Sequence, residues 1–391
     1  MSGPSKKQTG ISYARHALLP EGFRDQLAPI AEFEASLVRG LMDTFAAYGY
    51  DRVAPPVVEY EDSLLVGAGA TRGEQMFRLM DPDTQRMMAV RADMTIQMSR
   101  LAATRLSDAE RPLRLSYTGN VLRTKGSQIR PTRQFVQAGI ELVGATNLEA
   151  EFEIVSVAVE ALTNVGVKAL SLDFTLAPLV RMLCEQHKLT GRDCDLVLEA
   201  LDAKDSGALR AIAAAARADF DVLLGAAGHA DTAMDALRTL SLKGSAGQLI
   251  ARLGRLIDMV KAQLPDIQVT VDPCENHGFE YKSGIGFALF AKGSHSELGR
   301  GGRYIVDHAD GNNEEAAGFS VYLDSVLDAV SAPATAKRLF LPVGSEQQLG
   351  QQLRSEGWRT IQGLTDVADA SNEAQRLGCS HVLIDGQIIA L

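Results

Sequence analysis

The sequence predicts an α+β fold in which a large mixed core is followed by a small α/β domain. Two strand-like runs between residues 113 and 143 flank a polar loop, the pattern of an antiparallel hairpin. Residues from about 176 to 264 are rich in Ala and Leu at helical spacing and poor in strand formers, which predicts a helical insertion. We therefore expect a core over residues 1–331 and a separate domain over residues 336–391.

Composition limits the class of protein. A chain of 391 residues with a formal charge of -10 can bury a substantial core, but it opposes non-specific binding to nucleic-acid phosphates. The four cysteines are scattered without a Cys-x-x-Cys pair, so we predict reduced thiols and no metal site. The first ten residues lack a signal-peptide core, and no apolar run reaches transmembrane length. We expect a cytoplasmic protein without a membrane partner.

The first regular elements are a helix and an edge strand. Apolar residues recur every three or four positions from Ile30 to Phe45, which is the period of an amphipathic helix. The following segment, 50–59, contains Pro55 and Pro56, and it therefore cannot continue the helix or occupy a central ladder. An ordinary helix–strand unit explains this pattern on its own.

The remaining elements follow the same periodicity rules. In the core the expected elements are a helix at 149–165, a strand at 168–174, strand character over 266–290 and a strand leading into a helix from 318. Gly299 to Tyr304 lacks the context and terminal Lys of a phosphate-binding loop, so a tight hairpin turn is predicted there. In the small domain the expected strands are 338–343, 359–362 and 381–384, and the expected helices are 346–356 and 368–377.

The second strand of the hairpin carries the polar residues of greatest interest. Period two places Gln137 and Glu141 on one face and an apolar set on the other, which must pack on a core. Four residues apart on a strand, their Cα atoms lie roughly 13 Å apart, so two long side chains can clasp an amino acid between them. The alternative is the exposed face of a half-buried sheet.

Four stretches in the same order resemble the histidyl-tRNA synthetases, over roughly residues 17 to 331. They are Arg133-Gln134-Phe135-Val136-Gln137-Ala138-Gly139-Ile140-Glu141, Arg91-Ala92-Asp93-Met94-Thr95, His277-Gly278-Phe279-Glu280-Tyr281-Lys282-Ser283-Gly284 and Gly301-Gly302-Arg303-Tyr304. The resemblance implies a class II aminoacyl-tRNA synthetase-like core, an antiparallel sheet flanked by helices. It also implies a homodimer formed through the helix and strand at 30–59.

The departures from that family fall on the groups that activate ATP. Adenylation develops negative charge that fixed cations must stabilise. Lys125 stands where the family has a Glu, and His277 and Ser325 stand where it has arginines, whereas Arg123 matches. Losing one such donor typically lowers the rate about 10²–10³-fold. The resemblance therefore implies lost catalytic positions, no catalytic residues and no cofactor.

A synthetase-like core with these departures is similar to the regulatory subunits of ATP phosphoribosyltransferase. The resemblance implies a hetero-octamer with the short-form catalytic subunit of the first step of L-histidine biosynthesis. In it the regulatory chain activates the partner and mediates feedback inhibition by histidine. The implied histidine-binding residues are Asp93, Thr95, Arg123, Gln137, Glu141 and Tyr281.

No tRNA ligand is implied. The C-terminal domain resembles a shortened anticodon-binding domain and carries five Lys/Arg against six Asp/Glu over residues 336–391. Two alternatives remain at this point: a divergent, active histidyl-tRNA synthetase, and a pseudo-synthetase module that binds RNA or another protein for unrelated regulation.

Overall fold

The computed structural model divides the chain into two compact units, Met1–Ser331 and Ala332–Leu391. The residues it describes are 18–65, 73–127, 130–275, 282–308, 310–332 and 337–391. Within those ranges no helix is long and apolar enough to cross a bilayer.

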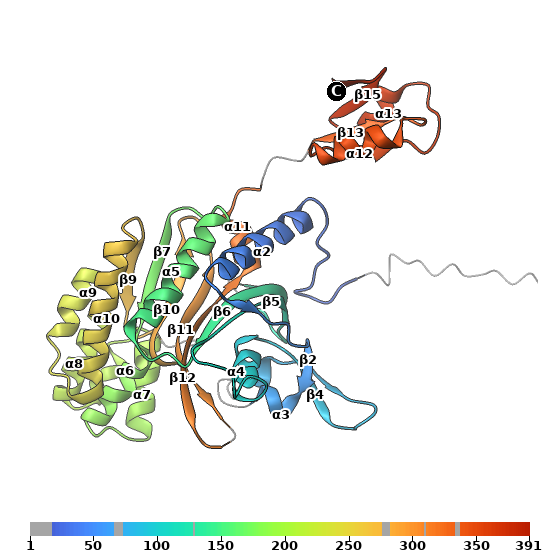
Figure 1. Cartoon of the computed structure of the whole chain (residues 1–391). Coiled ribbons are helices and arrows are strands. Elements are labelled where there is room, and N and C mark those ends of the chain that lie inside the picture. The colour runs from blue at the N-terminus through green and yellow to red at the C-terminus, as the bar shows by residue number, and fades with distance from the viewer. Residues whose placement is uncertain (1–17, 66–72, 128–129, 276–281, 309, 333–336) are drawn as a thin grey trace, which may run out of the picture. The chain divides into compact units, whose positions relative to one another are not determined.

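A nine-stranded sheet forms the frame of the first unit (Figure 1), in the order β1-β5-β6-β12-β11-β10-β7-β9-β8. Its strands are β1 (Asp51–Arg52), β5 (Leu113–Leu122), β6 (Gln134–Val143), β7 (Leu170–Thr175), β8 (Gly228–His229), β9 (Gln268–Asp272), β10 (Lys282–Ala291), β11 (Gly299–Asp307) and β12 (Asn313–Tyr322). The centre is antiparallel, as predicted, but β1 runs parallel to β5, and β7 runs parallel to β9. The sheet is therefore mixed.

Two helices cover one face of this sheet. They are α2 (Ile30–Ala47) and α5 (Leu148–Asn164), which pack against each other in front of the strands in Figure 1. Their buried residues, among them Phe45 and Ile154, share one apolar cluster with Ile140 of β6. Both helices were predicted from their apolar period, and α11 (Leu323–Ala329) follows β12 as expected.

The opposite face holds α4 (Thr95–Ala103) and a small sheet, β2-β4-β3. This sheet contains β2 (Val58–Tyr60), β3 (Arg78–Met80) and β4 (Met87–Val90), and the short helix α3 (Glu61–Leu64) lies beside it. Met94 and Met98 pack with Tyr117 of β5 and Phe135 of β6. Because α4 begins at Thr95, this packing fixes the start of the helix over the sheet.

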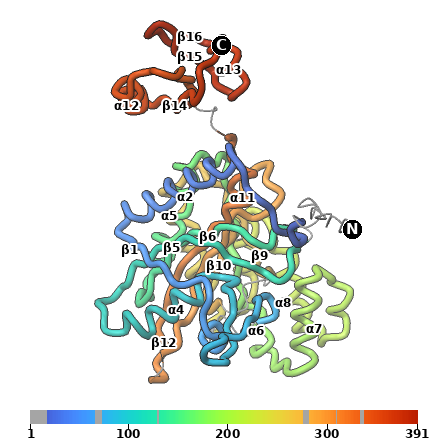
Figure 2. Tube along the Cα trace, turned by 90° about the vertical axis from the view of Figure 1, so that its right-hand side faces the viewer, coloured from blue at the N-terminus to red at the C-terminus, as the bar shows by residue number. Residues whose placement is uncertain are grey.

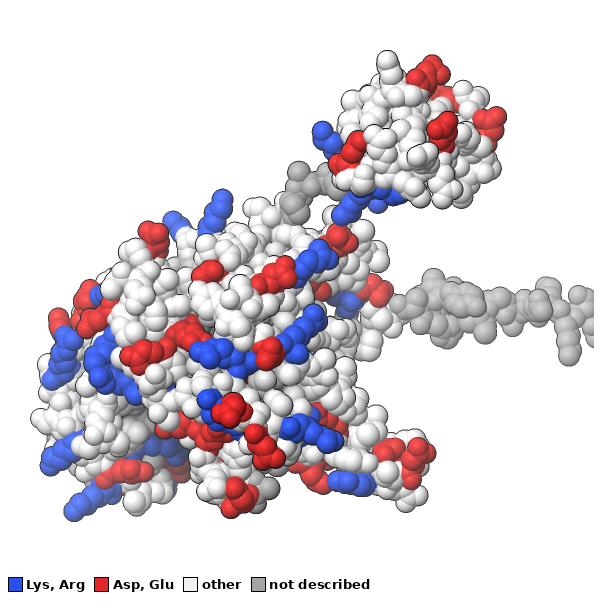
Figure 3. Space-filling view, viewed as in Figure 1, with Lys and Arg blue, Asp and Glu red and all other residues white. Residues whose placement is uncertain are grey.

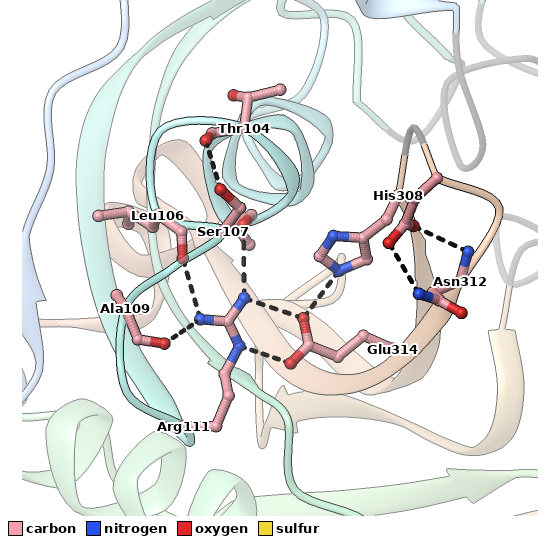
Figure 4. A network of polar contacts seen from close by, with 10 residues as sticks. Thr104, Leu106, Ser107, Ala109, Arg111, His308, Asn312 and Glu314 are labelled. Carbon is pink, nitrogen blue, oxygen red and sulfur yellow. Dashed lines mark hydrogen bonds and ion pairs between the residues drawn. The ribbon is translucent and has the colours of Figure 1, made fainter.

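A charged network ties the segment after α4 to the β11–β12 hairpin (Figure 4). Arg111 donates to the carbonyls of Leu106 and Ala109 at 2.9 and 2.7 Å, and to both carboxylate oxygens of Glu314 at 2.5 and 3.2 Å. The ring of His308 contacts the same carboxylate at 2.9 Å. Bidentate Arg–carboxylate pairs restrict the orientation of both side chains, so this network holds the segment after α4 against β12.

The predicted insertion is mainly helical. It consists of α6 (Ala177–Gln186), α7 (Arg192–Asp202), a 3-10 turn at Ala208–Ala211, α8 (Ala214–Gly225), α9 (Ala230–Arg238) and α10 (Gly244–Gln263), with β8 as its short strand. Figures 1 and 2 show these helices gathered at the β9 end of the sheet, away from α4.

The second unit is a four-stranded sheet, β14-β13-β15-β16, with two helices. Its elements are β13 (Arg338–Leu341), α12 (Gln347–Ser355), β14 (Arg359–Gln362), α13 (Ala370–Arg376), β15 (His381–Ile384) and β16 (Gln387–Ala390). The last strand was not predicted. It follows a turn at Asp385 and Gly386, which both have positive φ, and Asp-Gly is a favoured dipeptide for two-residue hairpins.

The predicted glycine-rich turn is wrong, because Gly299 to Tyr304 lie inside β11. The glycines serve close packing between strands. A Cβ atom at Gly301 would lie 2.4 Å from the ring of Phe287, and one at Gly299 would lie 2.3 Å from the carbonyl oxygen of Ser320. The run therefore keeps β11 close to its neighbours instead of reversing the chain.

Candidate functional site

Three neighbouring strands build a polar floor on the face covered by α4. The register sets Gly139 of β6 between Tyr117 of β5 and Ser320 of β12, and it sets Glu141 opposite Gly318. A Cβ atom at Gly139 would lie 2.6 Å from the Tyr117 hydroxyl, so glycine leaves room for that hydroxyl at the centre of the floor.

Above this floor lies a narrow recess. It is lined by Asp93, Thr95, Glu141, Lys282, Arg300, Gly318, Phe319, Ser320 and Tyr322. The space between its walls is about 10 Å³, roughly the room of one water molecule, so binding an amino acid requires the lining side chains to shift.

Glu141 is the central acidic group of the recess. Its side chain is buried, and its Oε1 accepts a hydrogen bond from Tyr117 at 3.2 Å. Its other oxygen, Oε2, has no hydrogen-bond partner among the described residues, and leaving a buried acceptor unmatched costs about 1–3 kcal/mol. Burial raises the pKa of Glu141 to about 8, against the opposing charge of Lys282. Gly318 makes this placement possible, because a Cβ atom there would lie 1.7 Å from Oε2.

Asp93 and Thr95 form the start of α4 at the edge of the recess. Asp93 accepts the backbone N–H of Thr95 at 2.8 Å, and the Thr95 hydroxyl lies 3.4 Å from the hydroxyl of Tyr117. Buried Arg91 holds the turn in place by donating to the carbonyls of Asn120 at 2.8 Å and Pro55 at 3.0 Å.

Gln137 is buried beside the recess but does not line it. Its amide oxygen accepts the backbone N–H of Met94 at 2.9 Å, and its amide nitrogen donates to Ser320 at 2.7 Å. It thus braces the turn before α4 against β12. Direct contact between Gln137 and a ligand stays a prediction.

Arg123 and Lys125 lie in a second, larger pocket of about 330 Å³ lined mainly by the loop between β5 and β6. The Arg123 guanidinium lies 5.0 Å from the centre of the Phe135 ring and 6.0 Å from that of Tyr322. The structure therefore brings Asp93, Thr95 and Glu141 together in the recess, whereas Arg123 lines the second pocket. His277 and Tyr281 lie outside the described residues.

Ser325 is buried at the start of α11, and Arg130 occupies the space beside it. Arg130 donates to the Ser325 hydroxyl at 2.7 Å and to the carbonyl of Glu297 at 3.0 Å. Its guanidinium also lies 4.2 Å from the centre of the Tyr322 ring and 3.5 Å from Asp324. The sequence interpretation missed this arginine, which lies in the polar loop between β5 and β6, where no period marks it.

Two cations complete the recess, and the interpretation of the sequence gave neither a ligand-binding role. Lys282 is buried and donates to the carbonyl of Gly302 at 3.2 Å. Arg300 lies on β11 and donates to Glu297 at 3.0 Å from Nε and 2.6 Å from Nη2. Acidic and basic groups thus face one cavity, which suits a zwitterionic ligand. The described residues contain no cluster of three or more potential metal ligands.

The profile of the histidyl-tRNA synthetase family matches residues 22–326. The chain is 48% identical to an ATP phosphoribosyltransferase regulatory subunit of Paramagnetospirillum magneticum over 95% of this chain and 97% of that protein. It is 46% identical to the protein of the same name from Rhodospirillum rubrum, over 95% and 96% of the two chains.

Two solved structures share the fold. The first is described as an ATP phosphoribosyltransferase regulatory subunit/histidyl-tRNA synthetase from Bacillus halodurans. It superposes with a TM-score of 0.80 at 22% identity, covering 96% of this chain and 97% of that one. A histidyl-tRNA synthetase from Nostoc sp. PCC 7120 gives a TM-score of 0.78 at 18% identity, covering 94% and 91%.

Proposed function

Because the chain belongs to the family of ATP phosphoribosyltransferase regulatory subunits, which shares the histidyl-tRNA synthetase fold, we propose that it is a non-catalytic histidine sensor. In this proposal L-histidine binds in the recess. Its occupancy sets the activity of a short-form catalytic subunit in the first step of histidine biosynthesis and mediates feedback inhibition. The observation that carries the proposal is the buried Glu141 oxygen that no described residue satisfies.

The polar groups of the recess match the parts of histidine. Asp93, at the start of α4, would accept the α-ammonium group, and Glu141 would accept an imidazole N–H. Thr95 lies between them in the recess lining, and Gln137 would act mainly by holding the turn before α4. Tyr281, adjacent to Lys282, belongs to the proposed ligand set through the family resemblance.

The absence of catalysis is part of the proposal. Lys125, His277 and Ser325 are the positions that would fail to stabilise an adenylation transition state. Arg130 lies against Ser325, but its guanidinium contacts Asp324, the Ser325 hydroxyl and the Glu297 carbonyl, so we propose that it holds the start of α11. Exchange of labelled pyrophosphate into ATP, dependent on histidine, is expected to stay at background. Sustained exchange would favour an active synthetase.

The proposed assembly joins this chain to itself and to the catalytic subunit. We propose a dimer through α2 and the strand that follows it, within a hetero-octamer. Exposed apolar side chains at and before the start of α2 support this, since Leu27 is 74% and Ile30 is 53% exposed. Histidine can shift the complex only by its differential affinity for two states, typically about 1–3 kcal/mol.

We propose no tRNA ligand and a cytoplasmic location. On the face shown in Figure 3, acidic and basic side chains are interspersed and form no continuous basic stripe of the kind that tracks a phosphate backbone. The formal charge of -10 supports the same conclusion.

Calorimetric titration of the purified chain with L-histidine tests the pocket. Wild type is expected to bind, and Glu141→Gln is expected to lose binding because the amide oxygen, although an acceptor, carries no negative charge for the ligand and its NH2 group adds a donor. Glu153→Gln is the matched control, since Glu153 is a half-buried carboxylate that pairs with Arg114. Binding that survives Glu141→Gln undiminished would reject this recess.

A further inference from the structure

We propose that Arg300 binds the α-carboxylate of the amino acid in the recess, and that Glu297 is its positioning residue. This inference rests on the proposed function, because it assumes that the ligand is an amino acid. It names the group that replaces the synthetase arginine at position 277 and assigns the carboxylate to β11 instead of the β5–β6 loop.

The strand register places Arg300 at the right distance from Glu141. Arg300 lies opposite Ser320, two residues along β12 from Gly318, which lies opposite Glu141. Two strand spacings of about 4.8 Å and two residues of about 3.3 Å separate the Cα atoms by roughly 12 Å. Both side chains lie on the same face of the sheet, so they can contact opposite ends of one small ligand.

The other basic groups near the recess are committed elsewhere. Lys282 donates to the Gly302 carbonyl and favours the charged form of Glu141, so its charge serves the acidic end. Arg123 lies against the Phe135 ring in the second pocket. Among the described residues, Arg300 and Lys282 are the basic ones in the recess lining, and we assign the carboxylate end to Arg300.

Arg300 is also held ready for this role. The Glu297 carboxylate accepts hydrogen bonds from Nε and Nη2 of Arg300, along one edge of the guanidinium. The two side chains are only 21% and 19% exposed. A guanidinium carries five donors in a planar fork, which lets one arginine contact more than one acceptor. Arg130 in turn donates to the Glu297 carbonyl, which fixes the backbone beneath the clamp. A guanidinium fixed in advance loses little side-chain entropy when the ligand arrives.

The proposal therefore predicts which ligands bind tightly. A free carboxylate is required, so L-histidine is preferred over histidinol, which keeps the ammonium and imidazole groups but carries a hydroxymethyl group. Hydrogen bonds to charged groups contribute about 1.5–3 kcal/mol, so the preference is expected to be roughly ten- to hundredfold.

The experiment measures both ligands on the full chain by calorimetry, for wild type, Arg300→Gln and Glu297→Gln. In Arg300→Gln the histidine affinity is expected to fall to near that of histidinol, while histidinol affinity changes little. Glu297→Gln is expected to reduce the preference partly, because Arg300 is still present but less well oriented. A purely structural role would lower both affinities and leave their ratio unchanged.

The control is Arg376→Gln in the second unit, where Arg376 pairs with Glu373 at the same spacing along the chain and also at 2.6 Å. It should leave both affinities unchanged. Should Arg300→Gln lose both ligands through misfolding, Arg300→Met, which keeps an unbranched side chain without the charge, is measured instead. A preference still at the wild-type value in the methionine variant would overturn the proposal.

Two results distinguish failure of the proposed function from failure of the role of Arg300. No histidine binding to wild type would overturn the proposed function and this inference with it. Normal histidine binding, lost in Glu141→Gln but with an unchanged preference over histidinol in Arg300→Gln, would overturn the role of Arg300 alone.

Discussion

Replacing Glu141 with Gln should stabilise the protein at alkaline pH while removing its ligand. The wild-type carboxyl is buried, and one of its oxygens has no hydrogen-bond partner among the described residues. Above its pKa the group must carry a charge inside the recess, where it lacks solvation. A neutral amide of nearly the same shape avoids that charge but cannot act as the acidic end of the binding site.

The size of the effect follows from the pKa. Burial raises the pKa of Glu141 from 4.5 to about 8. At about 1.4 kcal/mol for each pH unit, this corresponds to roughly 5 kcal/mol of stability. The folded-state pKa lies above the unfolded one, so this stability is fully present below pH 4.5 and is lost as pH rises to about 8. Water that enters the recess would solvate the carboxylate and lower this free-energy difference.

Urea denaturation at pH 5.5 and pH 9, followed by far-ultraviolet circular dichroism, measures the difference. The one tryptophan, Trp358, lies in the second unit, so its fluorescence would not report on the core. The variant should gain stability over wild type between the two pH values by roughly 3 kcal/mol, because part of the effect is already present at pH 5.5. An equal difference between variant and wild type at both pH values would refute a buried, titrating Glu141.

Two further substitutions test the frame of the recess. Gly318→Ala should abolish histidine binding, because the new Cβ would meet the Glu141 carboxylate at 1.7 Å, and calorimetry measures it; Gly225→Ala, in open space on α8, is the control that should bind normally. Arg303→Met should lower the free energy of unfolding by about 1–3 kcal/mol in urea titrations, because buried Glu151 loses its partner at 3.1 Å while it keeps Arg252 at 2.6 Å. A loss below about 1 kcal/mol would contradict that estimate.

Local patterns in the sequence predicted the elements that bury one side. Leu41 and Phe45 of α2 and Ile140 of β6 all point into one cluster, and one-sided burial of this kind leaves a period of 3.6 or 2 in the chain. The residues at the acidic end of the recess could be predicted from the sequence for a related reason. Asp93 and Glu141 fall in stretches whose residue order resembles a known family, and the structure brings both into one cavity.

The residues at the basic end of the recess could not be predicted from the sequence, because their positions depend on contacts between distant segments. Arg300 enters the recess through the pairing of β11 with β12, and nothing in its local sequence marks that register. The direction of Arg123 depends on the ring of Phe135, which lies twelve residues later on the return strand β6. The glycines near Arg300 suggested a turn, since the sequence alone does not distinguish a glycine needed for a bend from one needed for close strand packing.

The most direct measurement is phosphoribosyl transfer by the short-form catalytic subunit, assayed alone and with this chain across a histidine titration. The account predicts that the wild-type chain raises the rate and makes it sensitive to histidine. With Glu141→Gln the rate should still rise, but histidine should no longer suppress it. Histidine inhibition of equal strength with the wild-type and Glu141→Gln chains would contradict the claim that this recess is the sensor.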